Sequence, residues 1–382
     1  MSIFDDIPRD DTGPRSLEEP LFAYTNRSGR AEAGRVRQKL DEWVEAYPKS
    51  VREQLIARLL STSDDQHVSA AFELFLYHLL QARGCKIVSI EPKLGHTAKN
   101  PDFLVENAQQ ERFYMEAVMA TGLSKHEVGA RSRLNTALVA IDGVSSPRNF
   151  LDLKVTGTPS RPISVNKLKR ELKSWIAAPP ADQTARQAAP FLWDEHGAKI
   201  EVRAIPRSKP DGNAPAIGMR RTPVTRIDPS REIRPALKKK ATRYGKLEHP
   251  YLVALNALSA HHHEEAVTDA LLGTPCVEIS TGPDGKEIVR HLRRPDGIWY
   301  GPPDGRPQNT RISSVLALMR IDPWNFASKT GLLIPNPWAS KPLPKLELGT
   351  AELVLVDDAF ERRNGKAMHE LLNLPAAWPE AD

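Results

Sequence analysis

Residues 67–84, HVSAAFELFLYHLLQARG, constrain the fold of this chain more than any other segment. Their large apolar side chains recur at the spacing of a single helix face: Val68, Phe72, Phe75, Leu76, Leu79 and Leu80. Gly84 then supplies a helix stop. The three apolar segments that follow, CKIVSIEP, DFLVE and RFYMEAVMA, are short and separated by turn-forming residues, as expected for a meander of three strands. This order predicts an α/β protein.

Further elements are predicted along the rest of the chain. Helices are expected at 29–46, 50–61, 124–142, 165–177, 231–244 and 264–272, and strands at 150–156, 199–205, 250–258 and 276–280. Ser124 and Glu127 have the spacing of a capping box that opens helix 124–142, with the inward side chains Val128, Leu134, Leu138 and Ile141. Segments 178–198 and 206–230 are rich in proline and are predicted to be irregular.

With 382 residues, the chain can form two average domains or one domain with large insertions. We predict a mixed sheet flanked by helices, and four parts of the chain. These are a flexible acidic tail at 1–27, a helical cap at 28–62, an α/β core at 63–260 with a basic insertion at about 150–230, and a C-terminal α/β extension at 261–382. The extension belongs either to the core or to a domain of its own. The 32 prolines of the chain predict many extended connections and turns, and the C-terminal half is expected to be rich in loops.

The composition excludes several classes of protein. The two cysteines, Cys85 and Cys276, are too few for a disulfide framework or a cysteine-based zinc site, which favours a reducing compartment. There is no apolar run of membrane-spanning length, and the start MSIFDDIPRDD lacks the pattern of a signal peptide. We therefore expect a cytoplasmic protein. A phosphate-binding Gly-Lys-Ser/Thr loop and a dinucleotide fingerprint are also absent from the sequence.

Charge is distributed unevenly along the chain. The net charge of +5 is small, but residues 151–250 carry 21 Lys or Arg against 10 Asp or Glu. Such a segment suits contacts with phosphates, and a solvated lysine-rich surface explains it equally well. The candidate DNA-binding residues lie on the two basic helices: Lys167, Lys169, Arg170, Lys173, Lys238, Lys239 and Arg243.

The segment NPDFLVENAQQERFYMEAVMA, residues 100–120, carries two acids in a distinctive context. Asp102 enters the second strand of the meander, and Glu116 lies within the third, on the same face as Tyr114 and Val118. Pro-Asp occurs five times in the chain, but four of these pairs continue as Pro-Asp-Gly, which is turn chemistry. Only Pro101-Asp102 is followed by a strand and by a later strand glutamate.

With the helix FELFLYHLL, the pair PDF and the strand FYMEAVMA in this order, residues 67–120 resemble the core of the PD-(D/E)XK nuclease superfamily, which has the restriction-endonuclease-like fold. The resemblance implies that Asp102 and Glu116 bind Mg²⁺ or Mn²⁺, that Glu73 on the helix assists, and that the substrate is DNA. It also implies a lysine two positions after Glu116 that orients the attacking water.

The sequence departs from the family at this lysine, because Val118 occupies its position. One explanation is that another element supplies the basic residue. The candidates are Lys86, Lys93, Lys99, Lys125 and Lys238–Lys240. Among them we favour Lys239 or Lys240, because a basic helix and a buried strand at 250–258 could close the same core, and we name Lys240 as the catalytic candidate. The alternative is that the fold remains while hydrolysis is lost.

Three functions follow as expectations, and the third of them is a carboxylate–metal hydrolase of another fold. The first is a metal-dependent nuclease in restriction, phage defence or repair, acting as a homodimer or with a partner subunit. The second is an inactive nuclease-fold protein that serves as a DNA-binding or assembly subunit. The run His261–His263 could suggest a further metal site, but adjacent extended side chains point to opposite sides, so a polar lead-in to helix 264–272 is the favoured interpretation.

Overall fold

The computed structural model divides the chain into two compact units. It describes residues 2–122, 125–177, 189–211, 215–221, 228–259, 261–281, 283, 286–301, 306–327, 330–356 and 359–380. The core unit consists of Met1–Gly13, Pro20–Gly122 and Asp228–Asp382, and the insert unit of Pro14–Glu19 and Leu123–Ile227. The insertion predicted at about 150–230 therefore begins earlier, at residue 123.

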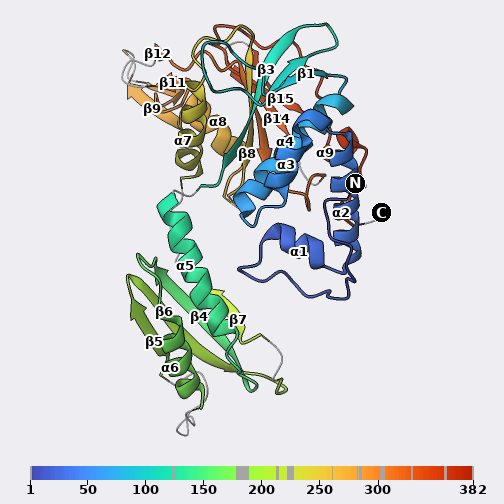
Figure 1. The fold of residues 1–382 in the computed structure, drawn as a ribbon. Helices are drawn as coiled ribbons and strands as arrows, with labels where there is room; N and C mark the ends of the chain where they lie inside the picture. The colour runs from blue at the N-terminus through green and yellow to red at the C-terminus, as the bar shows by residue number, and fades with distance from the viewer. Residues whose placement is uncertain are drawn as a thin grey trace. The chain divides into compact units, whose positions relative to one another are not determined.

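An eight-stranded mixed sheet forms the centre of the core unit (Figure 1). Its strands, in spatial order, are β1 (Lys86–Ile90), β2 (Phe103–Glu106), β3 (Arg112–Ala120), β8 (Tyr251–Ala257), β13 (Ser314–Met319), β14 (Leu332–Pro335), β15 (Ala351–Val356) and β16 (Ala359–Arg363). The first three strands form the predicted antiparallel meander, and β8 runs parallel to both β3 and β13. The predicted C-terminal extension thus completes the core sheet.

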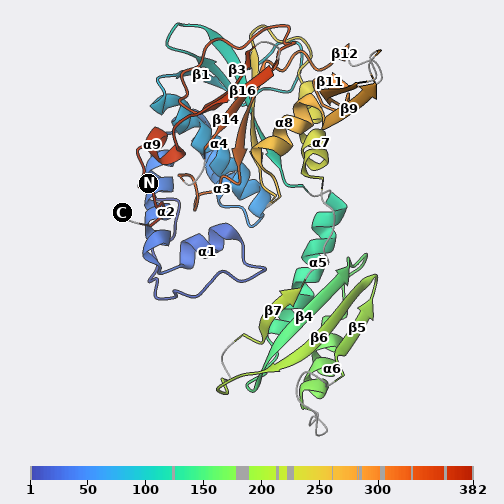
Figure 2. The same ribbon diagram turned by 180° about the vertical axis from the view of Figure 1, so that it is seen from behind.

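Helices cover both faces of this sheet (Figures 1 and 2). On one face lie α2 (Ala31–Ala46), α3 (Lys49–Leu59) and α4 (Asp64–Ala82), and on the other lie α7 (Pro229–Ala241) and α8 (Glu264–Leu272). The alternation of β3 separates the two cores, because Phe113 and Met115 pack on the α4 side while Tyr114 and Val118 pack on the α7 side. The face of β3 predicted for Glu116 is therefore the α7 face.

The basic helix and the buried strand behave as one crossover unit. In α7, Asp228 accepts a hydrogen bond from the backbone of Arg231 at 3.3 Å, and Pro229 occupies the first turn, where a missing N–H costs nothing. Every residue of β8 is buried, as its continuous apolar sequence predicts. The helix ends at Ala241 rather than at 244, and Gly245, with φ +67°, turns the chain beside His96.

The acidic N-terminal segment differs from the predicted flexible tail. Residues Leu21–Arg27 form helix α1, and Phe4 is only 7% exposed within the hydrophobic core. The backbone N–H of Ile3 also donates to Asp41 of α2 at 2.8 Å. Ile3 and Phe4 therefore anchor this segment in the core despite its acidic composition.

Smaller elements complete the core unit. They are the hairpin of β9 (Pro275–Thr281) and β10 (Glu287–Arg293), the short pair β11 (Tyr300–Gly301) and β12 (Arg306–Pro307), and helix α9 (Met368–Leu372). His263 caps α8 by accepting from the backbone of Ala266 at 3.2 Å, which confirms the histidine run as the lead-in to this helix. In the described part of the chain no helix has the length and hydropathy of a membrane span.

The insert unit has its own sheet and its own core. Its elements are α5 (Lys125–Asp142), β4 (Asn149–Gly157), α6 (Val165–Ala177), β5 (Phe191–Glu195), β6 (Ala198–Pro206) and β7 (Ile217–Arg221), with the sheet order β5-β6-β4-β7. Strands β5 and β7 lie in segments predicted to be irregular, because short strands near prolines carry little pattern. Val128 of α5 is exposed rather than inward, and Ser124 lies outside the described residues.

Candidate functional site

Two acids meet where β2 begins beside the middle of β3. The antiparallel register pairs Phe103 with Met115, so the preceding residue, Asp102, comes next to Glu116. The Oδ2 atom of Asp102 accepts the backbone N–H of Ala117 at 2.6 Å. The sequence placed these acids on neighbouring strands, and the strand register brings them side by side.

Glu116 is a buried carboxylate surrounded by donors. Its residue is 2% exposed, and the Nζ atom of Lys240 contacts Oε1. The hydroxyl of Tyr244 contacts Oε2 and lies 2.9 Å from the carbonyl oxygen of Asn100. Arg243 Nη1 lies 3.7 Å from Oε1. All three donors come from α7 or the turn that follows it, so the crossover unit supplies the positive charge of the site.

Lys240 reaches Glu116 although the position of the motif lysine is apolar. Val118, two residues after Glu116, is 3% exposed and packs in the core on the α7 side of the sheet. Because β8 pairs with β3 in parallel, the helix that connects them crosses this same face, and the last turn of α7 projects over Glu116. The other lysines considered, at 86, 93 and 99, have no recorded contact with Glu116, and the side chain of Lys125 is outside the described part of the chain.

The carboxyl group of Asp102 has unfavourable surroundings for its negative charge. Withdrawal from water raises its pKa well above the ordinary value, and the negative charges of Glu116 and Glu73 raise it further. The hydrogen bond from Ala117 and the charge of Lys240 act in the opposite direction. This is the environment in which a bound cation would have the largest effect, since it would stabilise the ionised carboxylate.

Glu73 projects from α4, and its charge acts on Asp102. Tyr47 donates its hydroxyl to Oε1 at 2.8 Å, and Arg58 forms an ion pair with Oε2 at 2.6 Å. Burial and the charge of Glu73 raise the pKa of the Tyr47 hydroxyl far above its ordinary value, so it remains a donor. Glu73 is thus held by two partners from the N-terminal helices, α2–α3, that no sequence motif singled out.

Two buried polar atoms beside Glu116 lack a hydrogen-bond partner. They are the hydroxyl of Tyr251, at the start of β8, and Nε of Arg243. Burial, together with the charge of Glu116, raises the pKa of Tyr251 well above its usual range, so this hydroxyl keeps its proton. Buried donors are usually hydrogen-bonded in folded proteins, so these two atoms are exceptions beside Glu116.

The oxygen ligands at this site are of the type that a hard cation prefers, but they are few. Asp102 and Glu116 offer carboxylate oxygens, which Mg²⁺ prefers, and Mg²⁺ commonly keeps several waters when only one or two carboxylates bind it. Among the described residues no group of three His, Cys, Asp or Glu has the arrangement of a metal site. A cation here would therefore be bound by two carboxylates and completed by water or substrate.

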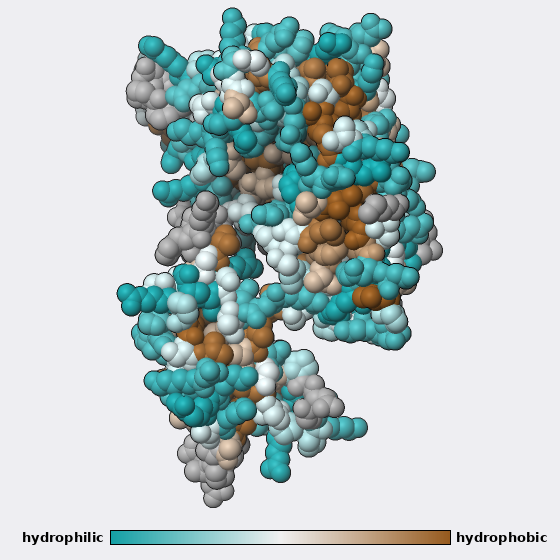
Figure 3. All heavy atoms as spheres, viewed as in Figure 1, coloured by the Kyte–Doolittle hydropathy of each residue, from teal (hydrophilic) through white to brown (hydrophobic). Residues whose placement is uncertain are grey.

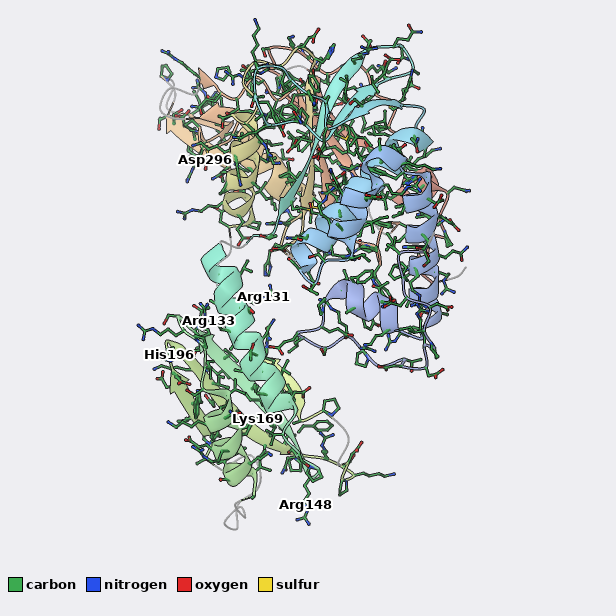
Figure 4. The ribbon with its side chains drawn as sticks, in the orientation of Figure 1. Arg131, Arg133, Arg148, Lys169, His196 and Asp296 are labelled. Carbon is green, nitrogen blue, oxygen red and sulfur yellow. The ribbon has the colours of Figure 1, made fainter. Side chains whose placement is uncertain are left out.

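The candidate DNA-binding residues divide between the two units. Lys167, Lys169, Arg170 and Lys173 lie on α6 of the insert unit, whose other labelled basic side chains in Figure 4 include Arg131, Arg133 and Arg148. Lys238 and Lys239 are exposed on α7 of the core unit, whereas Arg243 is half-buried beside Glu116. Hydrophilic residues cover most of the surface visible in Figure 3. Charge alone predicted seven equivalent residues, and the structure separates Arg243 from the rest.

Sequence patterns could have found only some of the site. Tyr244 lies four residues after Lys240, a spacing that suggests one helix face, but the helix ends at Ala241 and the tyrosine reaches Glu116 from the turn. No sequence motif links Tyr47 or Arg58 to the site, because both lie in the chain well before Glu73.

The chain matches no protein-family model, no curated protein and no solved structure. The structure is a mixed α/β fold with a large mixed sheet flanked by helices. The resemblance to the PD-(D/E)XK superfamily therefore depends on the sequence motif alone.

Proposed function

We propose that the core unit is a metal-dependent nuclease that hydrolyses phosphodiester bonds in DNA. The observation that supports this proposal is the contact between Lys240 and Glu116, because it brings an ammonium group to the acid that has Val118 two residues later in place of the motif lysine. The order α4, β1, β2, β3, α7, β8 adds support, since the basic helix and the buried strand close the same sheet that carries Asp102 and Glu116. Restriction, phage defence and repair all use such chemistry.

The residues take separate roles in this proposal. Asp102 and Glu116 hold Mg²⁺ or Mn²⁺, which when bound supplies positive charge at the scissile phosphate and lowers the pKa of water. Lys240 and Arg243 stabilise negative charge that develops beside Glu116. Tyr244 orients the Glu116 carboxylate, and Tyr47 with Arg58 fixes Glu73 so that it assists from the α4 side.

Lys240 has a defined position for its role. Its ammonium has three donors, of which the contact with Glu116 uses one, so the others can orient a water or a phosphate oxygen. The side chain is 16% exposed, so part of it reaches the surface. The geometry thus allows the lysine to act on a substrate without leaving its carboxylate.

The second candidate is an inactive nuclease-fold protein that binds DNA or a partner subunit. The observation that favours it is that the carboxylates already have partners within the protein. Glu116 contacts Lys240 and Tyr244, and Glu73 is held by Tyr47 and Arg58. A polar network of this kind can persist for structural reasons. The two candidates differ in whether a divalent cation binds beside Asp102.

Cleavage assays separate these candidates. The parent protein, Asp102→Ala and Glu116→Gln are incubated with Mg²⁺ or Mn²⁺ and with supercoiled, linear duplex and single-stranded DNA. We expect metal-dependent cleavage by the parent and its loss in both variants, each shown to be folded by circular dichroism. Metal binding followed by calorimetry provides a second readout. Absence of both cleavage and metal binding in the parent, or equal cleavage by all three proteins, contradicts the nuclease proposal.

A further inference from the structure

A basic hollow lies beside the acids on the α7 face of β3. It has a volume of about 510 Å³ and is lined by Lys93, His96, Tyr114, Lys246, Glu248 and Lys341, together with two leucines. Three of these side chains are lysines, and one carboxylate opposes them. The lining comes from the loop after β1, from β3, from the segment between α7 and β8, and from the loop after β14.

The hollow is joined to the acid site through two short connections. Tyr114 and Glu116 are alternate residues on one face of β3, about 6.6 Å apart at the usual rise of a strand. His96 also contacts the carbonyl oxygen of Tyr244 at 2.9 Å, and the side chain of this tyrosine contacts Glu116. A ligand that extends from the acids would therefore enter the hollow.

The three lysines of the hollow differ in their hydrogen bonds. Lys341 is half-buried and donates to the backbone carbonyl of Glu248. Lys93 and Lys246 are exposed, and neither ammonium has a recorded hydrogen bond or ion pair with the described residues. Two cations directed to one concave surface repel each other unless an anion binds between them. A phosphate is the anion that a nucleic-acid substrate supplies.

We propose that this hollow binds a backbone phosphate of the DNA strand near the scissile phosphate, which a metal ion held by Asp102 and Glu116 would contact. The position follows from Tyr114 and Glu116, which are alternate residues on one face of β3. Lys93 and Lys246 contact the phosphate, and the Tyr114 ring, which packs on His249 at 5.5 Å, forms the floor. The assignment rests on the proposed action of the core unit on DNA.

The test measures binding and not cleavage, so that it can be separated from the nuclease proposal. Fluorescence anisotropy follows a labelled 20-nucleotide single strand and the matching duplex, in EDTA, over a series of salt concentrations. The double variant Lys93→Ala/Lys246→Ala is compared with the parent. The matched control is Lys49→Ala/Lys366→Ala, which removes the same charge from two exposed lysines of the core unit that do not line the hollow.

We expect the hollow variant to bind DNA about tenfold more weakly, and the slope of log affinity against log salt to fall by about 1 to 2. The control variant should bind as the parent does, and the thermal unfolding midpoints of the three proteins should agree. Equal binding by the hollow and control variants overturns the assignment, as does a parent that binds no DNA. If the expected binding result is obtained but Mg²⁺ supports no cleavage, the nuclease proposal fails while the phosphate site stands.

Discussion

The two units of this protein place their charged residues in opposite ways. The longer segment of the insert unit, residues 123–227, carries 18 Lys or Arg against 9 Asp or Glu, whereas the rest of the chain carries 35 against 39. In the insert unit the basic side chains of α6 are mostly exposed around a small apolar core. In the core unit, Glu73 and Glu116 are buried, and Asp102 is withdrawn from water beside them.

This difference separates two kinds of electrostatic role. Exposed charges on the insert unit cost little to maintain and can attract phosphates from a distance, with an effect that salt screens. Buried acids of the core unit lose hydration, so they persist only where partners or a ligand offset that loss. We therefore propose that the core unit carries the chemistry and that the insert unit supplies general affinity for DNA, and the following experiments test that division.

The largest expected effect is at Lys240. Replacing it with alanine removes the cation from Glu116 and should lower the rate of DNA cleavage by about 10²–10⁴-fold, the usual contribution of a positioned catalytic group. Lys239→Ala is the matched control, because this neighbour is exposed on the same helix. Single-turnover cleavage rates with Mg²⁺ measure both. Equal rates for the two variants would remove Lys240 from the chemistry and weaken the contrast between the units.

A smaller effect is expected from the basic helix of the insert unit. Lys169→Ala/Arg170→Ala/Lys173→Ala should reduce affinity for duplex DNA and lower the salt slope by about 2 to 3, since each phosphate contact contributes about 0.9. Cleavage at saturating DNA should remain close to that of the parent.

The control for this helix is Lys49→Ala/Lys86→Ala/Lys366→Ala, which removes three exposed charges from the core unit. Anisotropy titrations with one duplex at several salt concentrations compare the two triple variants. If both reduce affinity and slope alike, binding depends on total charge, and the insert unit has no special part in it.

The smallest expected effect concerns stability at Asp102. Because folding raises the pKa of this carboxyl, the ionised form opposes folding, and the parent should lose stability as the pH rises above the unfolded value of about 3.8. Asp102→Asn retains an acceptor for the Ala117 N–H and removes the charge. It should raise the thermal midpoint at pH 7.5 by about 2–4 °C, the shift that about 1 kcal/mol produces in a domain of this size.

Thermal scans of the parent and Asp102→Asn at several values between pH 4 and pH 8 test this prediction. The difference between the two midpoints should widen as the pH rises. Mg²⁺ should stabilise the parent and leave the variant unchanged, because only the parent presents both carboxylates. A midpoint difference that stays constant with pH would show that the Asp102 charge is compensated within the folded protein.

Much of the core unit could be predicted from local patterns. The apolar stripe of α4 and the three segments after it gave the helix and the meander, because burial of one face imposes its period on the sequence. The continuous apolar run gave β8, which is buried on both faces. Strands β5 and β7 were missed because they are short, with prolines close by in the sequence, and the N-terminal segment was misjudged because a few anchoring side chains outweigh its acidic composition.

The sequence alone determined which face of β3 carries Glu116, since alternation along a strand is fixed by backbone geometry and places it with Tyr114 and Val118. Only the tertiary structure decided which groups meet it there. Lys240 lies 124 residues later in the chain, and it reaches Glu116 because β8 pairs in parallel with β3 and brings α7 across that face. Local periodicity reports burial, whereas contacts between distant residues depend on strand order and on the direction of each crossover.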